Sequence, residues 1–291
     1  MISAEKIKNL RIKTGAGMMD CKKALQEVNG DLESAVDWLR KKGISTAQKK
    51  ADRSASDGLI TVAKENNLAC IVEINSETDF VARNEDFQNF CNLVSKTILS
   101  NKIDNIDDLM KTNLESSQSS VSESLTELLA KIGENILIKR LDFIESDKNI
   151  FTQKYIHNSV NENSGKIGVL LSVRFDNSNE KLDSFTKNLA MHIAAMSPKS
   201  IDVNDLDKEL IEREKNIFQD QEKKSNKPEE IREKIINGKL NKFFSEVCLL
   251  KQDFVMENKT KVKDYINTFE KENNCNIEIQ NYFIYKVGET F

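Results

Sequence analysis

The residues with the clearest chemical potential lie in the stretch SETDFVARNEDF, residues 76–87, which follows the strand-like run LACIVEIN. The stretch sets an acid, Asp79, beside a large aromatic residue, Phe80, in what reads as a solvent-facing turn. An apolar side chain placed there is suited to burial in a partner surface rather than to catalysis. Spacing alone leaves a second interpretation open, in which Thr78 or Asp79 caps a helix starting near Arg83 and Phe80 packs as a hydrophobic staple.

The rest of the sequence offers no catalytic constellation. It contains none of GxxxxGK[ST], GxSxG and HExxH, the motifs of phosphate-binding loops, α/β-hydrolases and zinc proteases. Neither histidine has residues around it that resemble a metal cage or a triad. We expect His157 to be solvated unless it meets a partner, and His192, among apolar neighbours, to be structural. The sequence therefore predicts no enzyme, no metal site and no cofactor.

Composition indicates a soluble globular protein of two or three domains, with 291 residues of which 38% are hydrophobic and 31% charged. The net charge of −4 gives no general attraction to nucleic acid or membranes, and the basic stretch 40–53 lacks interleaved aromatic residues. Apolar runs are only strand-sized, which argues against a transmembrane helix. The first residues, MISAEKIKNL, lack a signal-peptide pattern, so we expect a cytoplasmic protein whose five dispersed cysteines stay reduced.

The first 43 residues are expected to form three short amphipathic helices. Glycines in TGAGMMD separate the first two helices, and Asp20 is predicted to cap the second. Apolar residues then recur at i, i+3, i+4 and i+7. They are Cys21, Ala24, Leu25 and Val28 in the second helix and Leu32, Ala35, Val36 and Leu39 in the third. Trp38 is assigned to packing inside this bundle.

A linker is predicted at residues 44–57, followed by an α+β core in two parts. The first part, 58–145, reads as two strands joined by an Asn-Asn turn, helices near 85–99 and 121–132, and a third strand. The second part, 146–291, repeats this order, with strictly alternating apolar residues in KIGVLLSVRF and a helix near 180–196. We therefore predict a duplicated core of antiparallel sheets covered by helices.

A charged segment interrupts the second part. From Lys208 to Lys234, 16 of 27 residues are charged, and the few large apolar residues have helical spacing. Asn226 and Pro228 break the pattern in the middle. This predicts an antiparallel helical hairpin inserted at about 205–242; a disordered charged linker is the alternative.

Seven strings spread along the chain carry a family resemblance. They are TGAGMMDCKKAL (14–25), ETDFVARN (77–84), IGENI (132–136), MHIAAMSP (191–198), KPEEIREKIINGKLNKF (227–243), QDFVME (252–257) and YKVGE (285–289). Together they resemble bacterial elongation factor Ts, the family of guanine-nucleotide exchange factors for elongation factor Tu. The resemblance departs at the end, where the family pattern usually continues past VGE into an acidic segment and a terminal helix.

The resemblance implies that this chain releases GDP from elongation factor Tu, which holds GDP through phosphate contacts and a Mg²⁺ ion. Five residues match the exchange motif that displaces the ion: Asp79, Phe80, Val81, Ala82 and Arg83. Phe80 would insert as a wedge between partner helices, where burial of the ring is worth about 2 kcal/mol. Asp79 would compete for contacts near the Mg²⁺ site.

The resemblance also implies that the N-terminal bundle is a ubiquitin-associated-like domain that binds the partner. Its matching residues are Gly15, Met18, Met19 and Asp20, and His157 would touch the partner's distal domain. Without the resemblance, paired methionines beside a helix start would be assigned to the core. The expected assembly is a heterodimer, with pairing into a dimer of heterodimers left open and no contact with nucleic acid or membrane. A protein-binding adaptor without exchange activity is the alternative function.

Overall fold

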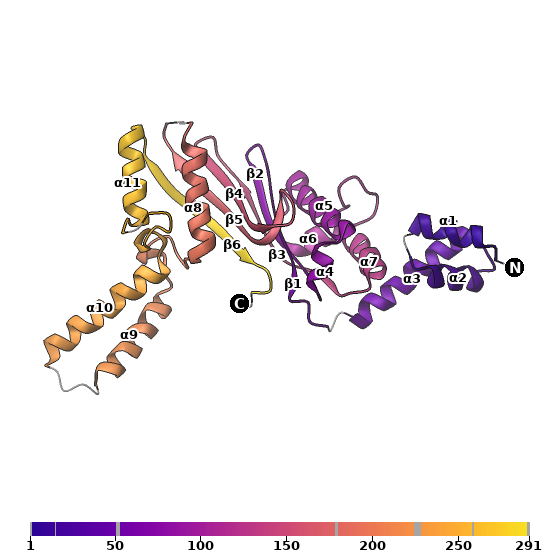
Figure 1. Cartoon of the computed structure of the whole chain (residues 1–291), viewed down its shortest axis with the longest axis horizontal. Coiled ribbons are helices and arrows are strands. Elements are labelled where there is room, and N and C mark those ends of the chain that lie inside the picture. Colours follow the sequence, from indigo (N-terminus) through magenta and orange to yellow (C-terminus); the bar gives the residue numbers. More distant parts are fainter. Residues whose placement is uncertain are drawn as a thin grey trace. The chain divides into compact units, whose positions relative to one another are not determined.

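The computed structural model describes residues 2–14, 16–50, 53–177, 180–223, 228–257 and 259–289, and no side chains at residues 44–49. The chain divides into two compact units (Figure 1). Unit 1 comprises residues 1–145, 156–168 and 285–291, and unit 2 comprises residues 146–155 and 169–284. Among the described residues, no helix is long and apolar enough to cross a membrane. The predicted division at residues 43, 57 and 145 stays a prediction.

Unit 1 begins with the predicted three helices, α1 (Ala4–Thr14), α2 (Met18–Glu27) and α3 (Leu32–Lys50). Their core is small and fully buried: Leu10, Cys21, Ala24, Leu25 and Ala35, with Trp38 packed against it. The predicted cap at Asp20 is wrong, because α2 starts two residues earlier and Gly17 is its N-cap. The predicted linker 44–57 also begins as helix, because α3 continues to Lys50; residues 51 and 52 of that linker lie outside the description.

The stretch 76–87 begins at the end of the middle one of three antiparallel strands in unit 1. They are β1 (Asp57–Glu65), β2 (Leu68–Ser76) and β3 (Ile136–Glu145), in the order β3-β2-β1. The Asn-Asn turn between β1 and β2 is as predicted, with Asn66 in the left-handed region at φ 54°. Because β2 lies between β1 and β3 and is buried along nearly its whole length, its end at Ser76 is firmly placed.

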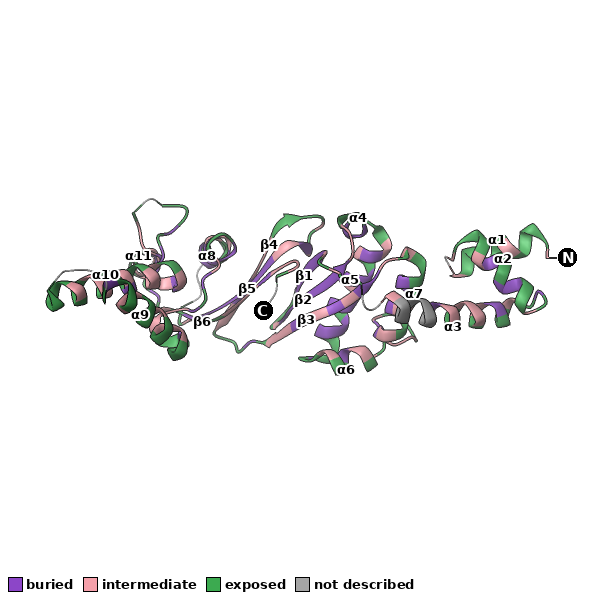
Figure 2. Ribbon diagram, turned by 90° about the horizontal axis from the view of Figure 1, so that it is seen from below, coloured by how far each residue is buried: buried purple, intermediate pink, exposed green. Residues whose placement is uncertain are grey.

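Helices pack on these strands and complete the first core. α5 (Glu85–Asn101) and α7 (Val121–Ile132) confirm the two predicted helices, and the sequence reading missed the short α6 (Ile106–Lys111). One cluster joins apolar residues of all three strands to residues of these helices, including the fully buried Phe87 and Ile98. Figure 2 shows the result as buried strands and helix faces with an exposed outer surface.

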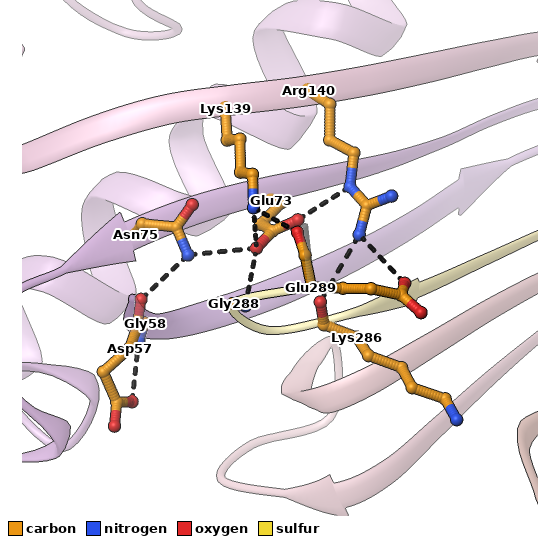
Figure 3. A network of polar contacts seen from close by, with 9 residues as sticks. All are labelled: Asp57, Gly58, Glu73, Asn75, Lys139, Arg140, Lys286, Gly288 and Glu289. Atoms are coloured by element: carbon orange, nitrogen blue, oxygen red, sulfur yellow. Dashed lines mark hydrogen bonds and ion pairs between the residues drawn. The ribbon is translucent and has the colours of Figure 1, made fainter. Parts of the chain in front are cut away.

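A buried ion pair fastens the end of the described chain to this sheet (Figure 3). Glu73 of β2 is fully buried, and its carboxylate accepts hydrogen bonds from Arg140 Nε (2.7 Å), Asn75 Nδ2 (3.0 Å) and the Gly288 backbone N–H (2.9 Å). Arg140 also donates to the Lys286 carbonyl at 3.3 Å. A buried carboxylate is tolerated because a cation and several donors compensate its charge. The YKVGE segment is therefore held by polar contacts.

The second round of elements confirms the predicted repeat. β4 (Ile150–Ser159) and β5 (Ser164–Phe175) precede α8 (Leu182–Met196), the short 3₁₀ turns η1 (Val203–Asp205) and η2 (Leu249–Lys251), α11 (Val262–Asn273) and β6 (Ile277–Lys286). β6 pairs with β5, as β3 pairs with β2. In unit 2, stacked aromatic rings join α8 to α11: Phe185 lies 4.0 Å from Phe269 between ring centroids and 5.1 Å from Tyr265.

Unit 2 also contains the predicted helical hairpin. α9 (Lys208–Lys223) and α10 (Glu229–Val247) lie side by side in Figure 1, and Pro228 is the N-cap of α10. The alternative of a disordered charged linker is therefore wrong for these two segments. The predicted breaker Asn226 lies outside the described residues.

Candidate functional site

The turn that leaves β2 is fixed by paired hydrogen bonds to the loop between α7 and β3. The backbone N–H of Thr78 donates to Glu134 Oε2 at 3.0 Å, and the Thr78 hydroxyl donates to Glu134 Oε1 at 2.8 Å. In the opposite direction, the backbone N–H of Asn135 donates to Glu77 Oε1 at 2.6 Å. We call these contacts of Glu77, Thr78, Glu134 and Asn135 the crossed clamp.

The clamped turn opens into α4 (Asp79–Ala82), a single helical turn with two opposite sides. Val81 and Ala82 are buried in the core of unit 1, whereas the side chain of Phe80 is 79% exposed. Asp79 and Arg83 are exposed as well. The five residues of the predicted exchange motif therefore separate into an inner pair that anchors α4 and an outer set of an acid, an aromatic ring and a cation.

The alternative reading of this stretch is wrong. The next helix, α5, is capped by Asn84, whose side-chain oxygen accepts the N–H groups of Asp86 (2.9 Å) and Phe87 (3.2 Å). Neither Thr78 nor Asp79 serves as that cap, and a ring as exposed as that of Phe80 forms no hydrophobic staple. The aromatic ring consequently has no packing role within the described chain that accounts for its place.

A second support reaches α4 from its C-terminal end. Gln88 of α5 donates from Nε2 to the Ala82 carbonyl at 3.1 Å, and Asn161 donates from Nδ2 to Gln88 Oε1 at 3.1 Å. These bonds satisfy a carbonyl at the end of α4, where helices leave carbonyl groups without intrahelical partners. α4 is thus bonded at both ends, which presents Phe80 on an ordered platform.

The N-terminal bundle carries its own exposed apolar residues. Met18 and Met19 at the start of α2 are 60% and 72% exposed, so the alternative of core methionines is wrong. Asp20, beside them, is half-buried and forms an ion pair with Lys42 of α3. Gly15 lies outside the described residues. Flexible apolar side chains of this kind suit a protein-binding surface.

The two histidines occupy different environments. His157 lies on β4 with its side chain exposed. The neighbouring strand approaches it closely, because a Cβ added to Gly165 would lie 2.8 Å from the His157 carbonyl oxygen. His192 is buried, accepts a hydrogen bond from the Val255 backbone N–H and bonds Gln252, so its structural assignment is confirmed.

Across the described residues, no group of three or more His, Cys, Asp or Glu side chains is placed to hold a metal ion. All five cysteines are buried and unlinked, and burial raises the pKa of Cys70 to about 12. Such thiols remain protonated and are poor nucleophiles. Around α4, the exposed side chains are those of Asp79, Phe80 and Arg83.

Comparison with known proteins supplies the family. A family model described as "Elongation factor TS" matches residues 77–289, a span that opens at the clamped turn and closes at the YKVGE segment. The chain belongs to the elongation factor Ts family. It is 43% identical to elongation factor Ts of Rickettsia felis over 290 residues, covering 99% of this chain and 92% of the relative.

Other relatives agree. Elongation factor Ts of Rhodospirillum centenum is 42% identical over 288 residues, 99% of this chain and 93% of the relative. That of Rickettsia prowazekii is 43% identical over 290 residues, 99% of this chain and 92% of the relative. Membership in the elongation factor Ts family supports a role as a translation elongation factor.

Sequence reasoning missed the supports of the site. Glu134 and Asn135 lie 54 or more positions beyond Phe80 in the chain, and Gln88 reads only as a polar residue of a helix. The string IGENI, which contains Glu134 and Asn135, resembles the family, but nothing in its residue types indicates a bond to Thr78. Only the packing of the α7–β3 loop beside β2 brings these groups together.

Proposed function

We propose that this chain binds elongation factor Tu carrying GDP and accelerates the release of GDP, after which GTP can bind. The observation that carries the proposal is Phe80, an exposed aromatic ring on a turn held by hydrogen bonds, in a stretch that resembles the family's exchange motif. The chain acts without catalytic chemistry of its own. It works in the cytoplasm as one half of a heterodimer, and makes no contact with nucleic acid or membrane.

Exchange follows from binding energy alone. A protein that binds the nucleotide-free partner more tightly than the GDP-bound form weakens GDP binding by the same factor, because coupling between two ligands is reciprocal. Insertion of Phe80 between partner helices would stabilise only the conformation in which those helices have separated. Burial of one aromatic ring is worth about 2 kcal/mol, or roughly a thirtyfold shift.

The charged neighbours of Phe80 make two further contacts with the partner. Asp79 competes for the contacts that hold Mg²⁺, and loss of the ion leaves the phosphate charges of GDP poorly compensated. Arg83 pairs with an acidic group of the partner. Val81 and Ala82 support the contact only indirectly, by fixing α4, because both residues are buried in the core of unit 1.

Two further regions complete the proposed interface. Met18 and Met19, with Gly15 and Asp20 nearby, bind the partner's nucleotide-binding domain, and His157 contacts its distal domain. Both methionines and His157 are exposed. These regions add affinity without affecting the nucleotide directly, so they belong to complex formation rather than to GDP release.

The test is release of fluorescent GDP from elongation factor Tu, followed by stopped flow with unmodified chain and with Phe80→Ala. We expect strong acceleration by the unmodified chain and a loss of about tenfold or more in the variant. Complex formation should persist, and the unfolding midpoint should not change because the ring is solvent-exposed. Equal acceleration by both proteins would refute the wedge. Complex formation without any acceleration would instead favour an adaptor that binds through the N-terminal bundle.

A further inference from the structure

We infer that Glu134 is a positioning residue for Phe80. Its carboxylate holds both hydrogen-bond donors of Thr78 and thereby fixes the orientation in which α4 presents the ring. The inference rests on the proposed exchange function and extends it to a residue outside the exchange motif, 54 positions beyond Phe80 in the chain.

α4 depends on contacts outside the helix for its stability. A helix of one turn has no stability of its own in water, because nucleation costs more than one turn returns. Thr78 is its N-cap residue, with an extended backbone (φ −130°, ψ 160°), yet the threonine side chain makes no cap bond to α4. The threonine hydroxyl is turned to Glu134 instead. The direction in which the chain enters α4 is therefore set by Glu134.

Glu134 is itself held in place by its neighbours in the sequence. It follows Gly133, which ends α7 in the left-handed conformation at φ 85°. It precedes the buried Asn135, whose backbone N–H donates to Glu77 and whose side-chain Nδ2 donates to the Arg53 carbonyl at 2.8 Å. Glu134, whose carboxylate accepts both bonds from Thr78, is thus held by the residues before and after it. The turn at Thr78 is therefore fixed relative to the core of unit 1.

A fixed orientation of α4 should strengthen binding to the partner. A side chain that is already held in its binding orientation loses little freedom when it inserts, so less binding energy is spent on ordering. If α4 were loose, only part of the population would present Phe80 correctly, and the apparent affinity would fall by that fraction. Two bonds to one carboxylate are charge-assisted and stronger than bonds between neutral groups. Glu134 consequently controls the fraction of molecules in which the ring of Phe80 is oriented for insertion.

A double-mutant cycle tests this inference in the full chain. Four proteins are compared in fluorescent GDP release from elongation factor Tu: the unmodified chain, Glu134→Gln, Phe80→Ala and the double variant. Glutamine keeps the size of the side chain but replaces one acceptor oxygen with a donor. We expect Glu134→Gln to slow release by about fivefold when Phe80 is present, the effect of one lost hydrogen bond of roughly 1 kcal/mol. In the Phe80→Ala background it should cause no further loss, because the two residues act through one ring.

Two controls separate positioning from general damage. Glu127→Gln makes the same change on an exposed glutamate of α7 and should leave release unaltered. Hydrogen–deuterium exchange of the free protein should speed up at residues 78–84 in Glu134→Gln, while the β1–β2 hairpin stays protected. Should Glu134→Gln fold poorly, Thr78→Val removes the same hydroxyl bond from the other side, and Thr78→Ser should restore it.

The outcomes distinguish the two proposals. Equal losses with and without Phe80 would assign Glu134 to general stability and overturn the inference, as would a Glu134→Gln protein that works at the unmodified rate. Both results leave the exchange function standing, provided that the unmodified chain accelerates GDP release. An unmodified chain that fails to accelerate release would overturn the exchange function and the inference together.

Discussion

At the scale of single residues, Phe80 and its two neighbours show how burial divides a short motif. Val81 and Ala82 lie in the core, while Phe80 is exposed although it has the largest apolar side chain of the three. An exposed aromatic ring forgoes the roughly 2 kcal/mol that burial provides. The position is explained if another surface supplies that burial, which is the basis of the proposed wedge.

His192 gives a residue-scale prediction about stability. The Val255 backbone N–H donates to His192 Nδ1 at 3.3 Å, so the neutral ring carries its proton on Nε2, which donates to Gln252 Oε1 at 2.9 Å. A second proton would have to sit on Nδ1, facing another N–H group. Burial is the largest cause that lowers the pKa of His192 below its usual value, and the bond to Gln252 partly opposes it.

The pH dependence follows from this lowered pKa. Below about pH 6.5 the unfolded chain takes up a proton at His192 that the folded chain resists, so stability falls as the pH drops through that range. One proton contributes at most about 1.4 kcal/mol per pH unit. Urea unfolding at pH 7.5 and 5.5 should therefore show a smaller loss for His192→Gln than for the unmodified chain. His157→Gln, the same change at the exposed histidine, should keep the full loss; identical pH dependence in all three proteins would contradict the assignment.

At the scale of elements, the helical hairpin depends on a polar contact between its two helices. Lys239 of α10 donates to Glu222 Oε1 of α9 at 2.8 Å, and Glu222 is buried. Lys239 also lies 5.9 Å from the ring centroid of Phe218. Lys239 therefore joins the two helices by a bond to a buried carboxylate.

Removal of the cation should loosen the hairpin. Lys239→Met leaves the carboxylate of Glu222 buried without that cation, and we expect a loss of about 1–2 kcal/mol. Lys223→Met is the matched control, because Lys223 pairs with Asp220 at 2.8 Å on the exposed surface, where such pairs contribute below about 1 kcal/mol. Hydrogen–deuterium exchange of α9 and α10 reports both changes. Equal protection in the two variants would show that the contact is incidental.

At the scale of the whole molecule, the last part of the described chain lies beside the start of β1 in unit 1. Gly288 lies at φ 76°, and a Cβ added there would lie 2.3 Å from the Ser56 carbonyl oxygen. Its backbone N–H bonds the buried carboxylate of Glu73 (Figure 3). The YKVGE segment thus fits beside the start of β1 only with glycine at this position.

A pair of glycine substitutions tests this closure. Gly288→Ala should destabilise the protein by about 1–3 kcal/mol, since alanine meets both an unfavourable φ and a backbone oxygen. Gly238→Ala, in the middle of α10, faces open space and should raise helix stability by about 0.5–1 kcal/mol. Denaturant unfolding of the two variants gives the comparison. A neutral Gly288→Ala would show that the segment can detach without cost.

Most helices and strands could be predicted from the sequence, because they depend on the spacing of residues close together in the chain. The strand in KIGVLLSVRF, the Asn-Asn turn and the helices with apolar residues at i, i+3, i+4 and i+7 each depend on neighbours along the chain, and each appears where it was predicted. The alternation predicted for that strand is wrong as a pattern of burial, because every residue from Gly168 to Val173 is buried. The exposure of Phe80 followed from the family resemblance, because spacing alone left the packed alternative open. Errors occurred at helix boundaries. α2 begins two residues before the predicted cap at Asp20, and α3 continues to Lys50, beyond its apolar repeat.

The groups that support the site could not be predicted from the sequence, because folding brings them together from distant positions. The bonds from Thr78 to Glu134 and from Gly288 to Glu73 join residues that are 56 and 215 positions apart. Glutamate is usually a solvated surface residue, and its type alone carries no sign of such a partner. Its role arises when packed strands and helices bring a donor within bonding distance. Periodicity along the chain therefore predicts the elements, whereas the orientation of α4 depends on contacts that exist only in the folded protein.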